Sequence, residues 1–258
     1  MRSSLKSPPV SDSATTADGD AGSGDAAIPE AAIHLHPTAP LAERVLLPGD
    51  PGRALALAQS LLEQPLMFNH NRGLWGYTGQ AQDGLPLTIQ ATGMGGPSAA
   101  IVLSELIALG ARQAIRVGTC GALDRSLGLG DLLLAREAIC ADGTSRALGA
   151  GERTLADDGL HEALARNAPE AACGAVVSVD LFYERDRTPR ADAHKGALAV
   201  EMEAATLFAL GAAEGVPVAC VLTVTDTFGA DGARTRIDGE QLRVAAERMG
   251  ALALTALG

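Results

Sequence analysis

The chain has 258 residues, of which 47% are hydrophobic, so it is long enough to bury a sizeable core in one large α/β domain. Its formal net charge of −11 argues against non-specific binding to nucleic acid or to an anionic membrane, because such partners attract a basic surface. A small anion would need a local pocket of positive charge.

The cysteines and the hydropathy pattern indicate a cytoplasmic protein. The 4 cysteines are widely spaced without a CxxC pair, and we find neither an apolar signal segment nor a transmembrane run. Reduced thiols are therefore expected. No spaced set of histidine, cysteine and carboxylate residues indicates a metal site, so neither a metal nor a cofactor is expected.

Expected strands and helices alternate along the chain. Residues 1–30 are rich in Ser, Ala, Gly, Asp and Pro, which predicts a disordered extension before a domain over 31–258. Strand patterns follow at 44–47, 87–91, 114–117, 132–135, 175–179 and 218–224, and helix patterns at 51–62, 97–109, 201–214 and 239–257. Residues 142–169 have no clear period and predict surface loops with a short helix. This order predicts an α/β fold: a single-domain three-layer sandwich with a mixed, largely parallel central sheet.

Two glycine-rich segments join predicted strands to predicted helices. Residues 47–53 read LPGDPGR and residues 93–98 read GMGGPS, and in both a proline stands at the first helical position. The second segment is not the dinucleotide fingerprint, because Ser98 occupies the place of its third glycine, and no Walker loop occurs in the chain. The alternative for the second segment is a tight turn without a ligand.

A phosphate site is predicted around a third glycine-containing turn, expected at 118–121 after the strand that carries Arg116. Arginine offers a planar donor fork, Thr119 a hydroxyl group, and glycines bare backbone amides, all of which suit an oxyanion. Ligands of open α/β sheets bind at the carboxyl ends of strands, so this turn and the one before Arg53 are expected to converge. Taken singly, each arginine is more often a surface charge, and the prediction depends on their combination.

The segment 199–205 is the first of two that could hold a sugar or a base. It places Glu201 and Glu203 around Met202 at the start of an alanine-rich helix. A carboxylate could accept hydrogen bonds from two sugar hydroxyls while the thioether contacts the ring. The alternative is that acidic residues in the first turn compensate the helix dipole.

Asp226 and an aromatic pair form the second group. Asp226 is expected at a strand end, where a raised pKa would allow it to act as a general acid; the alternative is a turn or helix cap. Phe182 and Tyr183 could form a wall against which a nucleobase stacks, and core packing is the alternative.

Six segments, in order between residues 45 and 226, together resemble the nucleoside phosphorylase-I family: LPGDPGR, GMGGPS, IRVGTCG, DLFY, VEMEA and TVTD. The resemblance implies reversible phosphorolysis of a nucleoside to a free base and a pentose 1-phosphate. It also implies inorganic phosphate as co-substrate, no cofactor, and homo-oligomers assembled from dimers, often hexamers. The family includes purine nucleoside phosphorylases and uridine phosphorylases.

The resemblance further implies roles for individual residues. Those that match phosphate ligands are Gly49, Arg53, Arg72, Arg116 and Thr119. Those that match nucleoside contacts are His34, Met94, Phe182, Met202 and Glu203. Arg72 and His34 would be lent by the neighbouring subunit, with His36 as an alternative match for His34. Asp226 would protonate N7 of a departing purine.

One departure from the family pattern concerns the base site. Purine-specific members usually carry an arginine where this chain has Gly239, and Arg234 or Arg236 could replace it. Uridine-specific members have a glutamine and an arginine after the aromatic pair, whereas residues 184–187 here read ERDR. Purine (deoxy)ribonucleosides are therefore the expected substrates. A uridine phosphorylase, a hydrolytic nucleosidase and a non-catalytic nucleoside-binding protein are the alternatives.

Overall fold

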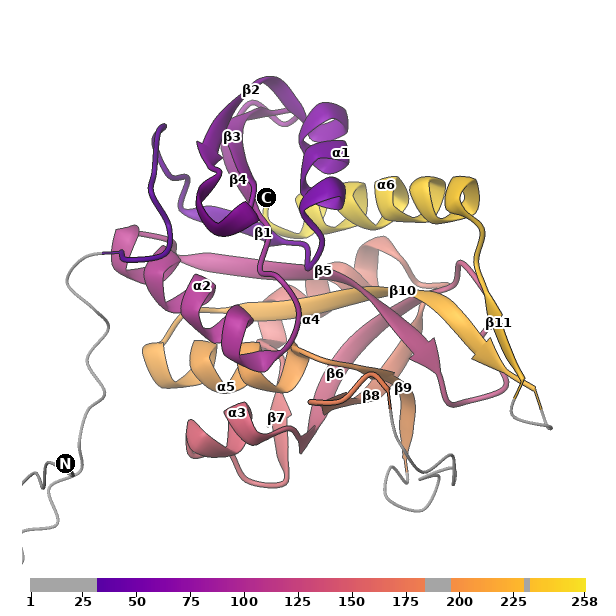
Figure 1. Cartoon of the computed structure of the whole chain (residues 1–258). Helices are drawn as coiled ribbons and strands as arrows, with labels where there is room; N and C mark the ends of the chain where they lie inside the picture. Colours follow the sequence, from indigo (N-terminus) through magenta and orange to yellow (C-terminus); the bar gives the residue numbers. More distant parts are fainter. Residues whose placement is uncertain (1–31, 184–195, 230–232) are drawn as a thin grey trace, which may run out of the picture.

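The computed structural model describes residues 32–183, 196–229 and 233–258 (Figure 1). The expected disordered extension, residues 1–30, and the segment 184–187 lie outside the described residues. The described helices are α1 (Pro51–Leu61), α2 (Gly96–Leu109), α3 (Gly143–Ala147), α4 (Asp158–Asn167), α5 (Ala204–Glu214), α6 (Gly239–Ala256) and the short 3-10 helix η1 (Asn71–Gly73). None of them is long and apolar enough to cross a lipid bilayer.

The strands form one mixed sheet. They are β1 (Arg44–Leu47), β2 (Leu62–Asn69), β3 (Gly76–Ala81), β4 (Pro86–Gln90), β5 (Gln113–Ala122), β6 (Leu132–Ala141), β7 (Arg153–Leu155), β8 (Ala172–Val179), β9 (Ala197–Glu201), β10 (Val218–Phe228) and β11 (Arg234–Arg236). At the centre, β4, β1, β5 and β10 are parallel neighbours. The strands β5, β10, β6, β8 and β9 also pair in a closed ring, because β9 returns to β5.

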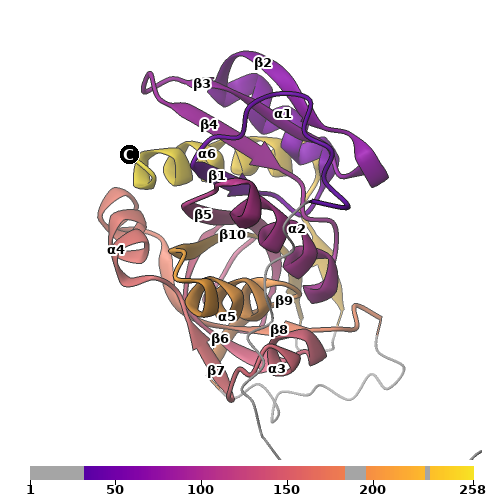
Figure 2. The ribbon, with the colours of Figure 1, turned by 90° about the vertical axis from the view of Figure 1, so that its left-hand side faces the viewer.

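Helices cover both faces of the sheet, so the expected α/β sandwich with a mixed sheet is confirmed. Figure 1 shows α1 and α6 on one side of β5 and β10, and α2 and α5 on the other; Figure 2 gives the view turned by 90°. Alternating side chains of the central strands supply the two cores. In β5, Ala114 lies in the core under α2 and α5, whereas Ile115 and Val117 lie in the core under α1, α4 and α6.

Three helices begin close to the carboxyl ends of strands. Helix α1 follows β1 and is capped by Asp50, whose side chain accepts a hydrogen bond of 2.6 Å from the Arg53 backbone N–H. Helix α2 follows β4 through Gly95, which has φ 85, a left-handed conformation that favours glycine. Helix α5 follows β9, and Glu203 is its N-cap residue. The N-termini of all three carry partial positive charge.

Several boundaries differ from the expectations. The turn expected at 118–121 is wrong, because β5 continues to Ala122, held by β10 on one side and β9 on the other. The helix expected from residue 201 begins at Ala204, since Glu201 ends β9. No strand was expected over 62–81, where β2 and β3 pair antiparallel with two register shifts that break the apolar alternation.

Candidate active site

The two glycine-rich segments and the start of α5 meet in one place. The Thr92 backbone N–H donates to Pro48 O at 2.8 Å. A Cβ built on Gly49 would lie 3.3 Å from Gly93 O, so a side chain there would crowd the second segment. The Gly95 backbone N–H donates to Glu203 Oε1 at 2.5 Å. The junctions expected to converge from their strand positions therefore do lie together.

Arg116 lies at the centre of this region. It is only 3% exposed, in β5 between Leu47 of β1 and Cys220 of β10. Its Nε donates to Glu201 Oε2 at 3.0 Å, and its Nη2 lies 2.5 Å from Glu203 Oε2. Its Nη1 is buried and has no hydrogen-bond partner among the described residues.

Small residues around Arg116 leave space for its guanidinium group. A Cβ on Gly118 would lie 2.7 Å from the Arg116 Cζ. A glycine is therefore needed at 118, because the Arg116 side chain lies over this position of its own strand. A Cβ on Gly49 would lie 3.9 Å from Arg116 Nη1. The unpaired nitrogen is thus directed towards the glycine turn after β1, where backbone amides are available to an anion.

Electrostatics link Arg53 to the same group. Burial is the largest cause of the lowered pKa of Arg53; the Arg116 charge lowers it further, whereas Asp50 and Glu203 oppose the shift. Burial also lowers the pKa of Arg116, but the Glu203 and Glu201 carboxylates outweigh it and raise the pKa above its ordinary value. Carboxylates thus lie close to both guanidinium groups and favour their charged forms against the cost of burial.

Glu201 is a member of this cluster that the sequence did not single out for function. It is 4% exposed, and burial raises its pKa, with the Arg116 charge opposing the shift. The motif VEMEA contains both carboxylates, but their spacing did not show that Glu201 ends a strand and that Glu203 stands just before a helix. A helix start expected at Glu201 placed both in the first turn, and that placement is wrong for both, because Glu201 ends β9 and Glu203 is the N-cap residue before Ala204.

Thr119 lies half-buried in β5, paired in register with Thr223 of β10. By strand alternation it faces the same side as Ile115 and Val117, which is the side covered by α1. Arg53 comes from the first turn of α1, on that side. Arg116 and Thr119 therefore extend to opposite faces of β5, so a ligand that contacts both would have to lie at the edge of β5, beyond its last pair with β1 at Leu47 and Arg116.

A second group of residues surrounds Asp226, where β10 has a bulge between Val224 and Asp226. The Thr225 hydroxyl donates to Asp226 Oδ2 at 2.8 Å, and Arg234 Nε of β11 donates to Oδ1 at 2.8 Å. The Arg234 guanidinium carbon also lies 4.8 Å from the centre of the Phe182 ring. Arg234, one of the two alternative arginines, thus contacts both the expected acid, Asp226, and the expected base-stacking ring, Phe182.

The pKa of Asp226 is lowered in this arrangement. Burial raises the pKa of Asp226, but the hydrogen bonds from Arg234 and Thr225 outweigh it, so the pKa lies below the ordinary value. The carboxylate form is therefore favoured. Cys120 lies between the two groups: burial raises its pKa to about 12, with contributions from Glu201 and Asp226 that Arg116 opposes.

The remaining expected nucleoside contacts are more exposed. Phe182 is 52% exposed and packs edge-to-face against Tyr183, with ring centres 4.9 Å apart, so core packing does not explain the pair. Met94 is 85% exposed, next to the Gly95 amide that holds Glu203. Met202 is half-buried between the two carboxylates.

His34 and Arg72 belong to a separate region that is held together by its own contacts. His34 Nδ1 lies 2.6 Å from Glu105 Oε1, and the Asn71 side-chain amide donates to His34 O at 2.9 Å. Arg72 is exposed and has φ 56, an uncommon conformation for a residue other than glycine. Glu105 was not singled out by the sequence, although a lone carboxylate in the apolar helix expected at 97–109 was an available signal.

His36, the alternative match, is exposed, and its ring contacts a carbonyl oxygen of its own segment. Its Nε2 lies 3.2 Å from Ile33 O, and its backbone N–H donates to Asn69 Oδ1 at 2.9 Å. The His34 ring is more firmly positioned than the His36 ring, because it contacts the buried carboxylate of Glu105.

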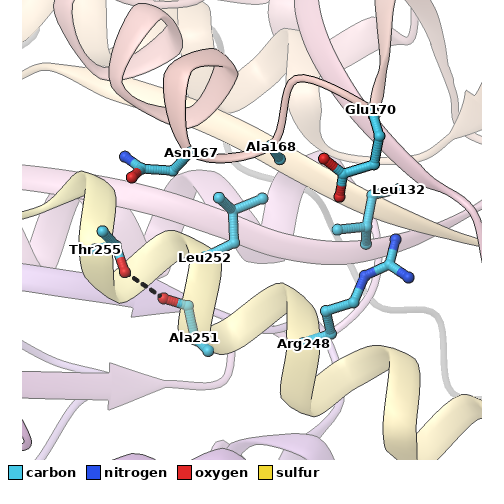
Figure 3. Close-up of a pocket in the computed structure, with 8 residues that line it drawn as sticks. All are labelled: Leu132, Asn167, Ala168, Glu170, Arg248, Ala251, Leu252 and Thr255. Atoms are coloured by element: carbon cyan, nitrogen blue, oxygen red, sulfur yellow. Dashed lines mark hydrogen bonds between the residues drawn. The ribbon is translucent and has the colours of Figure 1, made fainter.

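A surface pocket of about 270 Å³ lies elsewhere, between α4 and α6 (Figure 3). Its lining residues are Leu132, Asn167, Ala168, Glu170, Arg248, Ala251, Leu252 and Thr255. Figure 3 shows Arg248 and Thr255 on α6, with the Thr255 hydroxyl donating to Ala251 O at 3.0 Å. None of the residues expected to bind phosphate or nucleoside lines this pocket, and we assign the chemistry to the Arg116 region instead.

Known proteins are similar to most of this chain. The chain is 38% identical over 205 residues to a protein of Clostridium novyi named purine nucleoside phosphorylase DeoD-type, covering 73% of this chain and 84% of that protein. It is also 38% identical over 201 residues to the protein of that name from Geobacillus kaustophilus, covering 73% and 83%. A solved structure of purine nucleoside phosphorylase from Toxoplasma gondii in complex with immucillin-H matches with a TM-score of 0.77 and 28% identity, over 84% of this chain and 90% of that one.

The family profile described as Phosphorylase superfamily matches residues 43–258. That range contains both groups of the candidate site, from Gly49 to Arg234, and it confirms the resemblance found in the sequence. The chain belongs to the phosphorylase superfamily.

Proposed function

We propose that the protein catalyses the reversible phosphorolysis of purine nucleosides, giving a free purine base and a pentose 1-phosphate. The observation that carries the proposal is the buried Arg116 guanidinium, held by Glu201 and Glu203, whose Nη1 has no partner among the described residues. A buried donor without a partner is rare in a folded protein, and a bound anion would satisfy it. The relatives named purine nucleoside phosphorylase support this function and this enzyme class.

In this proposal, phosphate binds between the Gly49 turn, Arg53, Thr119 and Arg116 Nη1. Glu203 holds the pentose through its hydroxyl groups, with Met202 and Met94 against the ring. Phosphate attacks the anomeric carbon from the face opposite the base, while the C–N bond lengthens and its electron pair moves to the base. Positive charge then develops on the sugar between an anion and a carboxylate, which stabilises the transition state.

At the other end, Asp226 supplies a proton to N7 of the departing purine, so that the base leaves as a neutral molecule. The resting carboxylate is stabilised by Arg234. A base that stacks on Phe182 would compete with Arg234 for the ring and remove water from the carboxylate, and both changes raise the pKa of Asp226. We assign to Arg234 the place of the family arginine that is Gly239 here.

We further propose that the active unit is a homo-oligomer in which His34 and Arg72 complete the site of the neighbouring subunit. Both lie in one region tied together by Glu105 and Asn71, and Arg72 adopts a left-handed conformation, a form of strain that is common at functional sites. A dimer-based assembly, expected to be a hexamer, follows from the family resemblance. Location in the cytoplasm stays a prediction, based on the free cysteines.

Subunit mixing tests this arrangement. Arg72→Ala and Arg116→Lys proteins, each of low activity, are dissociated together and reassembled. If each site forms between two subunits, about half of the pairs in an equal mixture contain one subunit of each variant. One of the two sites in such a pair has both arginines intact, so activity should return to about a quarter of wild type. Activity no higher than the sum of the separate variants would contradict a shared site.

The proposed reaction is tested by incubating the purified chain with inosine, adenosine, guanosine and uridine, with and without phosphate. We expect base release from the purine nucleosides only when phosphate is present, together with formation of pentose 1-phosphate. Equal release without phosphate would indicate a hydrolytic nucleosidase. Faster turnover of uridine than of inosine would indicate a uridine phosphorylase, and binding without turnover a nucleoside-binding protein.

A further inference from the structure

The three nitrogens of the Arg116 guanidinium group have three different environments. Nε donates to Glu201, Nη2 faces Glu203, and Nη1 is unpaired within the described part of the chain. A carboxylate and a guanidinium group that meet without other restraint usually form two parallel hydrogen bonds. Glu203 makes only one contact with the group here, because its second oxygen accepts from the Gly95 backbone N–H.

Glu201 is fixed independently of Arg116. Its Oε1 accepts a short hydrogen bond from the Ser178 hydroxyl, and its Oε2 accepts one of 2.9 Å from the Glu203 backbone N–H. The Ala204 backbone N–H lies 2.9 Å from Oε2 and 3.0 Å from Oε1. The Ser178 hydroxyl in turn accepts from the Ala205 backbone N–H at 2.9 Å. Glu201 is therefore anchored to β8 and to the first turn of α5 before it contacts the arginine.

We propose that Glu201 is a positioning residue that sets the rotation of the Arg116 guanidinium group, so that Nη1 faces the phosphate while Glu203 stays free for the pentose. The inference rests on the proposed function and adds a residue to it. The Glu201 side chain is 0% exposed and both its oxygens accept hydrogen bonds from the protein, so in this proposal it acts through Arg116 and not on a substrate. It occupies the Nε edge, which keeps Arg116 from turning that edge towards Glu203 in a two-bond pair.

The position of Glu201 at the end of β9 explains why it can hold this edge. Its register neighbour Ser178 lies in β8, and Val200 pairs with Gly121 in β5, the strand that carries Arg116. A backbone fixed on both sides gives the carboxylate little freedom. Glu203, two residues later, lies beyond the strand as the N-cap residue of α5 and can serve a ligand.

The test is steady-state kinetics of Glu201→Gln with phosphate and inosine varied separately. The amide of the Glu201→Gln variant would carry no charge to hold Arg116 Nε, and its NH₂ group would face the backbone N–H donors that now bind the carboxylate. The Arg116 guanidinium group should therefore rotate towards Glu203. We expect the phosphate KM to rise about tenfold and the inosine KM, measured at saturating phosphate, to change less than about threefold. Ser178→Ala, which removes one anchor of the carboxylate, should raise the phosphate KM by about threefold.

Two further proteins separate positioning from general damage to the fold. Asp142→Asn is the matched control: Asp142 is equally buried and accepts from Ser145 N–H at 2.8 Å and from the Thr206 hydroxyl at 2.9 Å, without an arginine partner among the described residues. Its phosphate KM should not change. In an Arg116→Lys background, Glu201→Gln should alter the phosphate KM less than about twofold, because the group it orients is gone.

The inference is overturned if Glu201→Gln raises both KM values equally or neither, or if its effect persists in full in the Arg116→Lys background. If that variant does not fold, Ser178→Ala decides, and an unchanged phosphate KM there counts against the inference. A wild-type protein that shows no phosphorolysis would defeat the proposed function instead. In that case, loss of phosphate-induced thermal stabilisation in Ser178→Ala but not in Asp142→Asn would still support the role of Glu201.

Discussion

The Arg116 cluster and the Asp226 group are built differently, although both pair arginine with carboxylate. Arg116, Glu201 and Glu203 are 3%, 4% and 6% exposed, and their contacts join β5, β9 and the start of α5. In the Asp226 group, the Arg234 side chain is 35% exposed and comes from β11, a strand of three exposed residues at the edge of the sheet. Phe182, which it contacts, is half exposed.

The difference agrees with what each end would have to do. Phosphate is the same in every turnover and the pentose varies little between nucleosides, so a rigid, buried set of donors and acceptors can be prepared for them in advance. A purine base must enter, be protonated and leave. An exposed arginine and ring can move aside for it at little cost, because solvent screens their interactions.

The largest effect is expected from Arg116→Ala. Removing the cation leaves two buried carboxylates without it, and the free energy of unfolding should fall by about 3–5 kcal/mol, with loss of measurable phosphorolysis. Urea denaturation and the inosine assay measure both quantities. Arg243→Ala, which removes exposed ion pairs on α6, serves as the control and should change neither noticeably. If Arg116→Ala lowers the free energy of unfolding by less than about 1 kcal/mol, the cluster is not the rigid end of the site.

Asp226→Asn should act on the reaction rather than on the fold. Without a proton donor at N7, turnover of inosine should fall by about 10²–10⁴-fold. 7-Methylguanosine carries a fixed positive charge on its base and needs no protonation, so its turnover should fall far less. Single-turnover measurements with both substrates test this. Equal losses for the two nucleosides would contradict the role of general acid.

Arg234→Met should have the smallest effect and a distinct dependence on pH. Hydrogen bonding from Arg234 helps to lower the pKa of Asp226, and a carboxylate with a lowered folded-state pKa stabilises the protein above its unfolded pKa of about 3.9. The wild type should therefore be more stable by about 0.5–1 kcal/mol at neutral pH, a value reduced by the exposure of Arg234.

This advantage should disappear as the pH falls from about 4 through the folded-state pKa of Asp226. Urea denaturation at a series of pH values compares Arg234→Met with Arg236→Met, whose arginine acts on Asp226 through charge alone and should matter less. A difference between wild type and Arg234→Met that stays constant down to the lowest pH would contradict the assignment.

Much of the arrangement could be predicted from local sequence. The segments 47–53 and 93–98 combine glycine with a proline at the first helical position, and this chemistry indicates strand-to-helix junctions without knowledge of the fold. The strands that carry Arg116 and precede Asp226 were predicted from their apolar runs, which are also a local property. The turn expected at 118–121 failed because glycine signals a turn locally, whereas pairing with β9 and β10 holds these residues in a strand.

The sequence by itself determined the fold class, the family and the residue types of the site, because strand alternation, glycine turns and motif order are properties of neighbouring residues. Only the tertiary structure decided which side chains contact one another. Glu201 reaches Arg116 from 85 positions away, and Glu105 reaches His34 from 71. Arg234 reaches Asp226 because β11 folds back on β10. Such contacts, and the pKa values that depend on them, follow from how strands pair across the sheet, which no local pattern encodes.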